Sequence, residues 1–470
     1  AQQGELYNSE TLTINLDVSS EALIKARASD YNIKYITVNL THFPYETFNQ
    51  KIINFKTDPE ANLENNALFF KWENLTKRDK KISFGYNAKI ETNNKIIEIK
   101  EKVPFPITNL SKELEQFTKP GNVIDSNDEK IVRLASNLAA GEDDLYIVVH
   151  NIAEWTKNNI KYDLSTLTAE VSQKASWVLD NKQGVCDELT SLFIAMLRSL
   201  GIPAKFVSGI SYTNNPLFSE NWGSHGWAEV YFPDYGWIPY DVTYGQFGYI
   251  DPTHIKLKES IDSNESSVQY RWVSRNIELE TEKLNIDTSL EETYGVIKKP
   301  VRLEASVLKQ NIGFGSYNLI EVVLTNREDH YIPSEVYISR PEEVEIVGDA
   351  FKNVLLKPIE SKNIFWIVKL TENLQGNFLY TFPITVKTVR GFTENTEFKS
   401  TKNDIVYSLE EINNIMEQKK EEEEKIYSKD VNIDCDIDKK EFYEYEKALV
   451  ECKIKNSGNT FLENLNSCLK

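Results

Sequence analysis

The chain has 470 residues, which is too long for one ordinary domain and indicates three or four. Asp and Glu (72) outnumber Lys and Arg (53), so the formal charge is −19, which argues against nucleic acid as a partner. With 40% hydrophobic residues the chain can bury real cores, and wholesale disorder is excluded. No apolar stretch reaches the roughly 18 residues of a membrane span.

Residues 1–120 are predicted to form a β-sandwich. Leu12, Ile14, Leu16 and Val18 alternate with polar residues, which is the period of a half-buried strand. The alternation recurs in later segments of this region, and several short strands at such spacing are typical of a sandwich.

Residues 121–262 are predicted to form an α+β domain. Apolar residues take helical spacing from Asp128 onward. A further helix is expected over 187–200, because Gly201 and Pro203 follow it as a C-terminal stop signal. Strand-like runs then follow, and helices before an antiparallel sheet indicate this fold class.

The remainder of the chain is predicted to be mostly β. We expect a connecting segment over 263–299 and a second sandwich over 300–402, both sandwiches being of immunoglobulin-like type. Residues 403–429 carry a charge run that indicates a solvated helical spacer, with a docking tail as the alternative. Residues 430–470 are expected to begin a small β module.

The cysteines predict an oxidising compartment. Cys435, Cys452 and Cys468 lie close together near the end of the chain, which is typical of disulfide chemistry. Cys435 and Cys452 fall on expected neighbouring strands, so they are the predicted pair. Cys468 is then free or paired beyond Lys470, and we expect the gene to continue there, a membrane anchor being one candidate.

Export is also indicated by the start of the chain and by its sequons. The first residue is Ala1, so a signal peptide removed before it is expected. We therefore expect an extracellular or cell-surface protein. Four sequons are candidates for N-glycosylation: Asn39, Asn74, Asn109 and Asn264.

Cys186 is the candidate nucleophile. It opens the predicted 187–200 helix directly after Gly184 and Val185. The positive end of a helix dipole and the unpaired N–H groups there favour a thiolate near neutral pH. The same N–H groups can stabilise an oxyanion, although the sequence does not identify the second donor. An inert buried cysteine is the alternative.

His225 is the candidate general base and Asp241 its orienting partner. His225 precedes a predicted strand, Asp241 ends the next one, and a turn at 233–236 joins the two as a hairpin. Antiparallel pairing can set them side by side, facing the helix that bears Cys186. A surface histidine and a strand-end carboxylate are the alternative interpretations.

These segments resemble the transglutaminase-like superfamily. The resemblance rests on residues 184–209 around Cys186, on 224–231 around His225 and on 236–241, and it covers about 125–260. It implies a papain-like α+β core with a Cys-His-Asp triad at Cys186, His225 and Asp241. The chain departs from the family pattern at Gly226, where Ala is usual, and after Asp241, where Pro-Thr is common.

A triad of this kind implies acyl transfer through a thioester. We expect an exported cysteine protease or amidase that acts on a protein or peptide. A transglutaminase that cross-links proteins through lysine amines is the first alternative. A non-catalytic structural or adhesive surface protein with a silent core is the alternative from another class.

Neither metal nor other cofactor is expected, because the late cysteines lack zinc-ligand spacing and no clear calcium loop is visible. The oligomeric state is left open. The aromatic candidates for the substrate cleft are Trp222, Trp227, Trp237 and Tyr240. Core packing is the alternative for the tryptophans.

Overall fold

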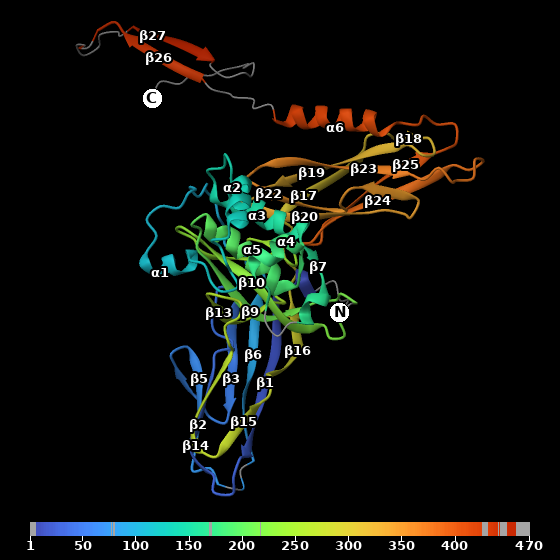
Figure 1. Ribbon diagram of the computed structural model, residues 1–470. Coiled ribbons are helices and arrows are strands. Elements are labelled where there is room, and N and C mark those ends of the chain that lie inside the picture. Colours follow the sequence, from blue (N-terminus) through green and yellow to red (C-terminus); the bar gives the residue numbers. More distant parts are fainter. Residues whose placement is uncertain are drawn as a thin grey trace.

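The computed structural model describes residues 6–76, 78, 80–168, 172–216, 218–424, 431–439, 441 and 449–456. Two β-sandwiches flank a mixed helix-and-sheet core, and the core lies between them (Figure 1). The predicted fold class, an α+β core with flanking β-sandwich domains, is therefore confirmed.

The N-terminal sandwich consists of two antiparallel sheets. One has the order β15-β1-β6-β3 with β16 also on β1, and the other has the order β14-β2-β5-β4. The alternating residues predicted from the sequence, such as Leu12 and Val18, point into the core between the sheets. The strands of residues 1–120 are β1 (Thr11–Ala26), β2 (Asn32–Leu40), β3 (Gln50–Asp58), β4 (Asn62–Glu64), β5 (Ala67–Glu73) and β6 (Lys81–Asn93).

The segment 263–299, expected as a connection, instead completes this sandwich. It supplies β14 (Val268–Arg275), β15 (Ile277–Thr281) and β16 (Asn285–Tyr294). β14 pairs with β2, and both other strands pair with β1. The physical reason is that the N-terminal strands leave unpaired backbone groups at their sheet edges, which a returning chain can satisfy.

The core packs four helices against a five-stranded antiparallel sheet of order β12-β11-β10-β9-β13. Its helices are α2 (Glu129–Leu138), α3 (Leu145–Asn159), α4 (Ala175–Asn181) and α5 (Cys186–Ser199). Its strands are β9 (Ala204–Tyr212), β10 (Trp222–Phe232), β11 (Gly236–Asp241), β12 (Gln246–Phe247) and β13 (Ile255–Ser260). Shorter elements are η1 (Leu6–Asn8), α1 (Lys112–Glu115), η2 (Gln116–Thr118), β7 (Lys161–Tyr162), η3 (Leu164–Thr168) and β8 (Gln183–Gly184).

Helix α5 is buried almost throughout, which fixes the position of its first residue. Leu192, Phe193 and Met196 are fully buried between the other helices and the sheet. At the C-terminal end, the guanidinium of Arg198 donates to the carbonyls of Ala204, Lys119 and Ile261. A buried charge with satisfied donors ties the helix to the loops on both sides.

The second sandwich covers the region predicted for it. Its sheets have the orders β17-β19-β23-β21 and β18-β25-β24-β20-β22. The strands are β17 (Val301–Val307), β18 (Asn311–Ile312), β19 (Tyr317–Asn326), β20 (Ile332–Ser339), β21 (Val344–Val347), β22 (Phe351–Leu356), β23 (Ser361–Leu370), β24 (Tyr380–Thr388) and β25 (Thr393–Ser400). Tyr331 and Leu355 join the hydrophobic core of the central domain, so the two units are packed together.

The predicted solvated spacer is in part a docked helix. α6 (Leu409–Glu424) lies along the second sandwich (Figure 1). Ile412 is fully buried there, Met416 packs beside it, and Lys419 forms an ion pair of 2.8 Å with Glu321. The apolar spacing of this helix is therefore used for packing, whereas the charged residues lie on its remaining faces.

The last described element is a two-stranded hairpin of β26 (Val431–Ile437) and β27 (Val450–Asn456). Cys435 and Cys452 face each other in its register and form a disulfide, as the sequence predicts. Cys468 lies outside the described residues. Among the described residues, no helix combines the length and hydrophobicity needed to cross a membrane.

Candidate active site

Cys186 is the first residue of α5 and is partly exposed. The chain reaches it through β8, which pairs in parallel with β7 so that Gly184 lies opposite Tyr162. A Cβ at Gly184 would lie 2.7 Å from the Cβ of Glu188, so the close approach of strand and helix requires glycine. The structure thus places the thiol at a helix N-terminus, as predicted.

Glu188 holds this turn in place and was not singled out by the sequence analysis. Its carboxylate accepts a 2.7 Å hydrogen bond from the Val185 amide and another from the Gln173 amide. The side chain is buried. A Glu at the third helical position is a recognisable capping signal, so the sequence did contain a clue to this role.

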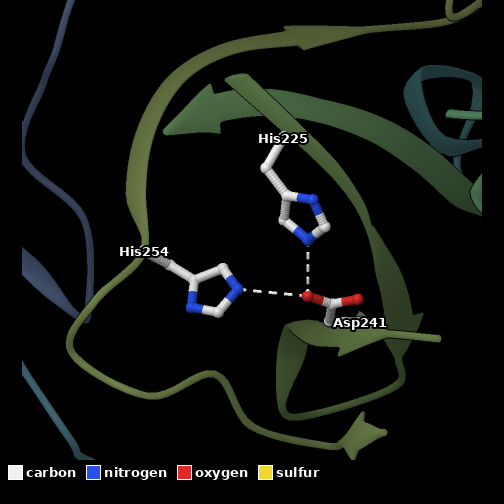
Figure 2. A group of neighbouring side chains, drawn as sticks. All are labelled: His225, Asp241 and His254. Atoms are coloured by element: carbon white, nitrogen blue, oxygen red, sulfur yellow. Dashed lines mark hydrogen bonds and ion pairs between the residues drawn. The ribbon is translucent and has the colours of Figure 1, made fainter. Parts of the chain in front are cut away.

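His225 and Asp241 lie side by side on neighbouring strands of the core sheet. β10 and β11 pair antiparallel, with Ala228 opposite Tyr240. The His225 Nε2 is 2.7 Å from Asp241 Oδ2, and both residues are buried (Figure 2). The hairpin predicted from the sequence therefore brings these two residues together in the expected way.

The Asp241 carboxylate is held by four groups. Oδ1 accepts from the amides of Thr243 and Tyr244 at 2.8 and 3.0 Å. Oδ2 faces the Nε2 atoms of His225 and His254, the second at 3.1 Å (Figure 2). Burial raises the pKa of Asp241, but the two histidines outweigh burial and hold that pKa well below its usual range. Asp241 is therefore a rigid, ionised carboxylate.

The resting thiol differs from the sequence-based expectation of a thiolate. Burial raises the pKa of Cys186 well above its ordinary value, and the carboxylate of Asp187 adds to that shift. The amide of Gly226 donates to the sulfur and acts in the opposite direction. The Cys186 thiol also donates a 3.6 Å hydrogen bond to Asp187 Oδ1. In the part of the chain that the structure describes, it makes no hydrogen bond to His225. Cys186 therefore needs a base to become a nucleophile.

Asp187 also accounts for the departure from the family pattern at Gly226. A Cβ at Gly226 would lie 2.6 Å from Asp187 Oδ1 and 2.6 Å from the ring of Phe206. The alanine that is usual at this position would push the carboxylate away from the sulfur. The absence of a side chain at Gly226 therefore leaves the space that the Asp187 carboxylate occupies beside the sulfur.

Replacing Asp187 by asparagine is expected to lower the pKa of Cys186, because a nearby negative charge is removed. The rate of Cys186 alkylation by iodoacetamide, followed against pH by mass spectrometry, measures this shift. Glu220→Gln is the matched control, since Glu220 lines the same cleft without contacting the thiol. An unchanged alkylation profile in Asp187→Asn would remove the carboxylate from this account.

Cys186 and His225 line one cleft of about 650 Å³. The N-terminal segment contributes Tyr7 to its wall, and the second sandwich contributes Tyr337 and Phe351. Apolar side chains thus enter the cleft from both flanking regions. The sequence analysis assigned no such role to the flanking domains, because which domain covers the cleft depends on tertiary packing.

None of the four aromatic residues predicted for the substrate cleft lines the cleft that contains Cys186, so that prediction is wrong. Trp227 and Tyr240 are fully buried in the core. Trp222 packs against Tyr212 beside the N-terminal sandwich, and Trp237 lines a separate pocket next to Lys205. They lie on strands next to the triad residues, but their side chains support the sheet and do not line the cleft.

Two clusters of described residues have the composition of a metal site, and one of them lies at the active site. Single ligand atoms of His225, Asp241 and His254 lie within 4.8 Å of one another. The Nε2 atom of each histidine is already engaged with Asp241 Oδ2, so a metal ion would have to break both hydrogen bonds. The cluster is better described as a hydrogen-bonded chain.

Comparison with known proteins identifies the middle of the chain. The family model described as the transglutaminase-like superfamily matches residues 132–242. The uncharacterised protein YebA of Bacillus subtilis (strain 168) is 25% identical over 192 residues, which are 38% of this chain and 25% of that protein. A protein-glutamine gamma-glutamyltransferase of Pseudomonas aeruginosa is 30% identical over 73 residues, 14% of this chain and 11% of that enzyme.

A candidate cysteine protease from Cytophaga hutchinsonii, known from its crystal structure, is 19% identical with a TM-score of 0.44. The match covers 61% of this chain and 93% of that one. The matches to the two curated relatives, from Bacillus subtilis and Pseudomonas aeruginosa, cover only 25% and 11% of the length of those proteins.

Proposed function

Because residues 132–242 form a core of the transglutaminase-like superfamily, we propose that the protein is a cysteine acyl-transfer enzyme that uses Cys186, His225 and Asp241. The observation that carries this proposal is the 2.7 Å hydrogen bond between His225 and Asp241 on the wall of the cleft into which Cys186 opens. The arrangement orients one histidine nitrogen and leaves the other, Nδ1, for the thiol.

The proposed reaction begins with attack of Cys186 Sγ on an amide carbonyl. His225 Nδ1 takes the thiol proton, and Asp241 stabilises the imidazolium that results. The tetrahedral intermediate collapses to a thioester when His225 returns this proton to the leaving amine. Water then attacks the thioester with His225 as base, which releases the acid and restores the thiol.

Tyr162 and the Cys186 amide are the proposed oxyanion donors. Tyr162 lines the cleft, and its hydroxyl accepts a hydrogen bond from the Cys186 backbone. Burial raises the pKa of Tyr162, and the nearby Cys186 and Asp187 raise it further, so the hydroxyl keeps a proton that it can donate. An oxyanion near both groups would take over the amide hydrogen bond that Tyr162 accepts in the resting protein, and the Tyr162 hydroxyl would donate a second bond to it.

Tyr162→Phe is expected to lower kcat roughly 10- to 1,000-fold while changing KM little, because an oxyanion donor acts mainly in the transition state. Steady-state kinetics on any substrate that Cys186 turns over would measure the change. Tyr337→Phe is the control, since Tyr337 also lines the cleft but comes from β20 of the second sandwich. Equal losses in both variants would argue that Tyr162 contributes only to the shape of the cleft.

We favour a protein or peptide substrate and hydrolysis of its amide. The cleft is large enough for several side chains, and Tyr7, Phe218, Tyr337 and Phe351 offer apolar and aromatic contacts to them. Amine transfer with protein cross-linking is the second candidate, because the same thioester can be attacked by a lysine amine. We also propose an exported or cell-surface location, which is compatible with the Cys435–Cys452 disulfide.

Two further points belong to this proposal. Of the four sequons, Asn74, Asn109 and Asn264 are exposed, whereas Asn39 is half-buried on the paired strand β2. Glycosylation at the three exposed positions remains a prediction. No cofactor is needed for the proposed chemistry.

A competition assay tests the function. The protein is incubated with unfolded casein and dansylcadaverine, and both new amino termini and bound fluorophore are measured. Peptide release that Cys186→Ala abolishes would support hydrolysis, and fluorophore incorporation that it abolishes would support cross-linking. If neither product forms, and Cys186 is alkylated as fast in His225→Ala as in the unsubstituted protein, the enzyme proposal loses to the non-catalytic surface protein.

A further inference from the structure

A second histidine, His254, shares the carboxylate of Asp241 with His225 (Figure 2). It lies in the loop before β13 and is buried, with only 3% of its surface exposed. Its Nε2 is 3.1 Å from Asp241 Oδ2, and its Nδ1 is 3.4 Å from Asp251 Oδ1. The mechanism above gives it no role, and a three-residue triad does not require it.

The second carboxylate, Asp251, is itself held firmly. The amide of Thr253 donates to Asp251 Oδ1 at 2.8 Å, and the side-chain amide of Gln246 donates to Oδ2 at 2.5 Å. His254 is thus placed between two ordered carboxylates, one on each ring nitrogen. An imidazole that donates from both nitrogens carries a positive charge.

The charge of His254 follows from the same geometry. Burial lowers the pKa of His254, but the carboxylates of Asp251 and Asp241 outweigh burial and raise it to about 9. The ring is therefore a cation at neutral pH. Its centroid lies 5.7 Å from the centroid of the His225 ring.

We propose that His254 is a positioning residue for the reaction: held as a cation between Asp251 and Asp241, it fixes the Asp241 carboxylate and offsets part of the negative charge that faces His225. This inference rests on the proposed function of His225. Asp251, His254 and Asp241 together then carry one net negative charge, which the imidazolium of His225 balances once it has taken the thiol proton. Without the His254 cation these groups would place two negative charges beside His225.

Other charged groups nearby do not replace this cation. Arg390 interacts with Asp251, but it stacks on Tyr249 and donates to Asn94, and no hydrogen bond joins it to the described Asp241 side chain. Lys205 and Lys256 line a pocket beside His254, but they pair with Glu229 and Glu259, so the four charges cancel. Tyr244 lies 5.6 Å from the His254 ring, and burial raises its pKa, which keeps it neutral. Among the described side chains in contact with Asp241, His254 is thus the cation that balances its charge.

The test measures ring pKa values by NMR in the full chain with Cys186→Ala, where no catalysis is needed. His254→Gln is expected to raise the pKa of His225 by about one to two units, because a cation less than 6 Å away is removed. Asp251→Asn should change the pKa of His225 less, because it removes a negative charge at the same time as it removes one of the two partners of His254. His150→Gln is the matched control, because His150 is also buried in the core but burial lowers its pKa to about 3 and keeps it neutral.

A purely structural His254 would give a different result. An unchanged or lowered pKa of His225 in His254→Gln would overturn the proposal. If His254→Gln fails to fold, the pKa of the His254 ring is measured in the Cys186→Ala protein instead. A value at or below about 6.5 would overturn the proposal that His254 is a cation. Since these readouts need no substrate, a failure of the acyl-transfer proposal in the casein assay stays distinguishable from a failure here.

The pH dependence of folding stability provides a second test, because a cationic His254 must lose its stabilising contribution as the pH rises. A histidine whose pKa is raised by folding stabilises the protein fully below its unfolded value of about 6.5, and this contribution is lost as the pH rises through about 9. The midpoint of urea unfolding should therefore fall more between pH 6.5 and 9 in the unsubstituted protein than in His254→Gln. Parallel curves for the two proteins would show that His254 is not a cation in the fold.

Discussion

Cys186→Ala and His225→Ala are each expected to reduce amide turnover to background, a loss of roughly 10⁶-fold in kcat. Cys186 supplies the bond to the acyl group, and the raised pKa of its thiol means that His225 must take the proton. Asp241→Asn should cost about 10⁴-fold, because the amide no longer stabilises the imidazolium or holds its tautomer. Single-turnover kinetics on the peptide that the casein assay identifies would measure all three variants.

Thermal unfolding of each variant is the control that shows whether it is still folded. All three variants should keep the thermal unfolding temperature within a few degrees, except that Asp241→Asn leaves two buried histidines with a weaker partner. Asp187→Asn should retain turnover, since Asp187 is not part of the proposed proton transfer. Substantial turnover in Cys186→Ala would eliminate the thioester mechanism.

Gly209→Ala is expected to have the largest effect on stability. A Cβ there would lie 2.0 Å from the backbone carbonyl oxygen of Ile255 and 2.7 Å from the ring of Trp227. The carbonyl belongs to β13, which pairs with β9 at this point, so it cannot move aside without breaking the sheet. We expect a loss of about 3 kcal/mol in the free energy of unfolding of the core domain.

The same substitution should also disturb the active site. In the sheet register His225 lies opposite Gly209, and His254 precedes the displaced strand. Thermal unfolding and Cys186 alkylation would measure the two consequences together. Gly223→Ala is the matched control on the neighbouring strand β10, because a Cβ at Gly223 has no atom within 4 Å. Equal melting temperatures for the two variants would contradict the packing argument.

Local sequence patterns predicted much of the central domain because its signals are short-range. The helix stop at Gly201 and Pro203 and the alternation on the strands depend on neighbouring residues, and α5 ends at Ser199 as they indicate. The approach of His225 to Asp241 followed from one hairpin, because antiparallel pairing brings the first part of β10 beside the end of β11. Cys435 and Cys452 likewise lie on two neighbouring strands.

Long-range pairing set the features that the sequence analysis missed. β14, β15 and β16 pair with β1 and β2, which lie far from them along the chain, for example Val268 with Leu40 and Tyr294 with Thr11, and no local signal states which sheet edge a strand will join. The cleft wall at Tyr337 and Phe351 depends on how the second sandwich docks. The burial of Ile412 against that sandwich likewise depends on how α6 docks, which the local sequence does not specify.

The sequence by itself determined the chemistry-bearing residues and their elements: a cysteine at a helix start and a histidine and an aspartate on one hairpin. Only the tertiary structure decided the electrostatics of the site. Burial and Asp187 raise the pKa of Cys186 against the effect of the helix N-terminus, and His254, held by Asp251, reaches Asp241 from a separate loop. Desolvation and charge pairing depend on which groups meet in space, and spacing along the chain does not encode that.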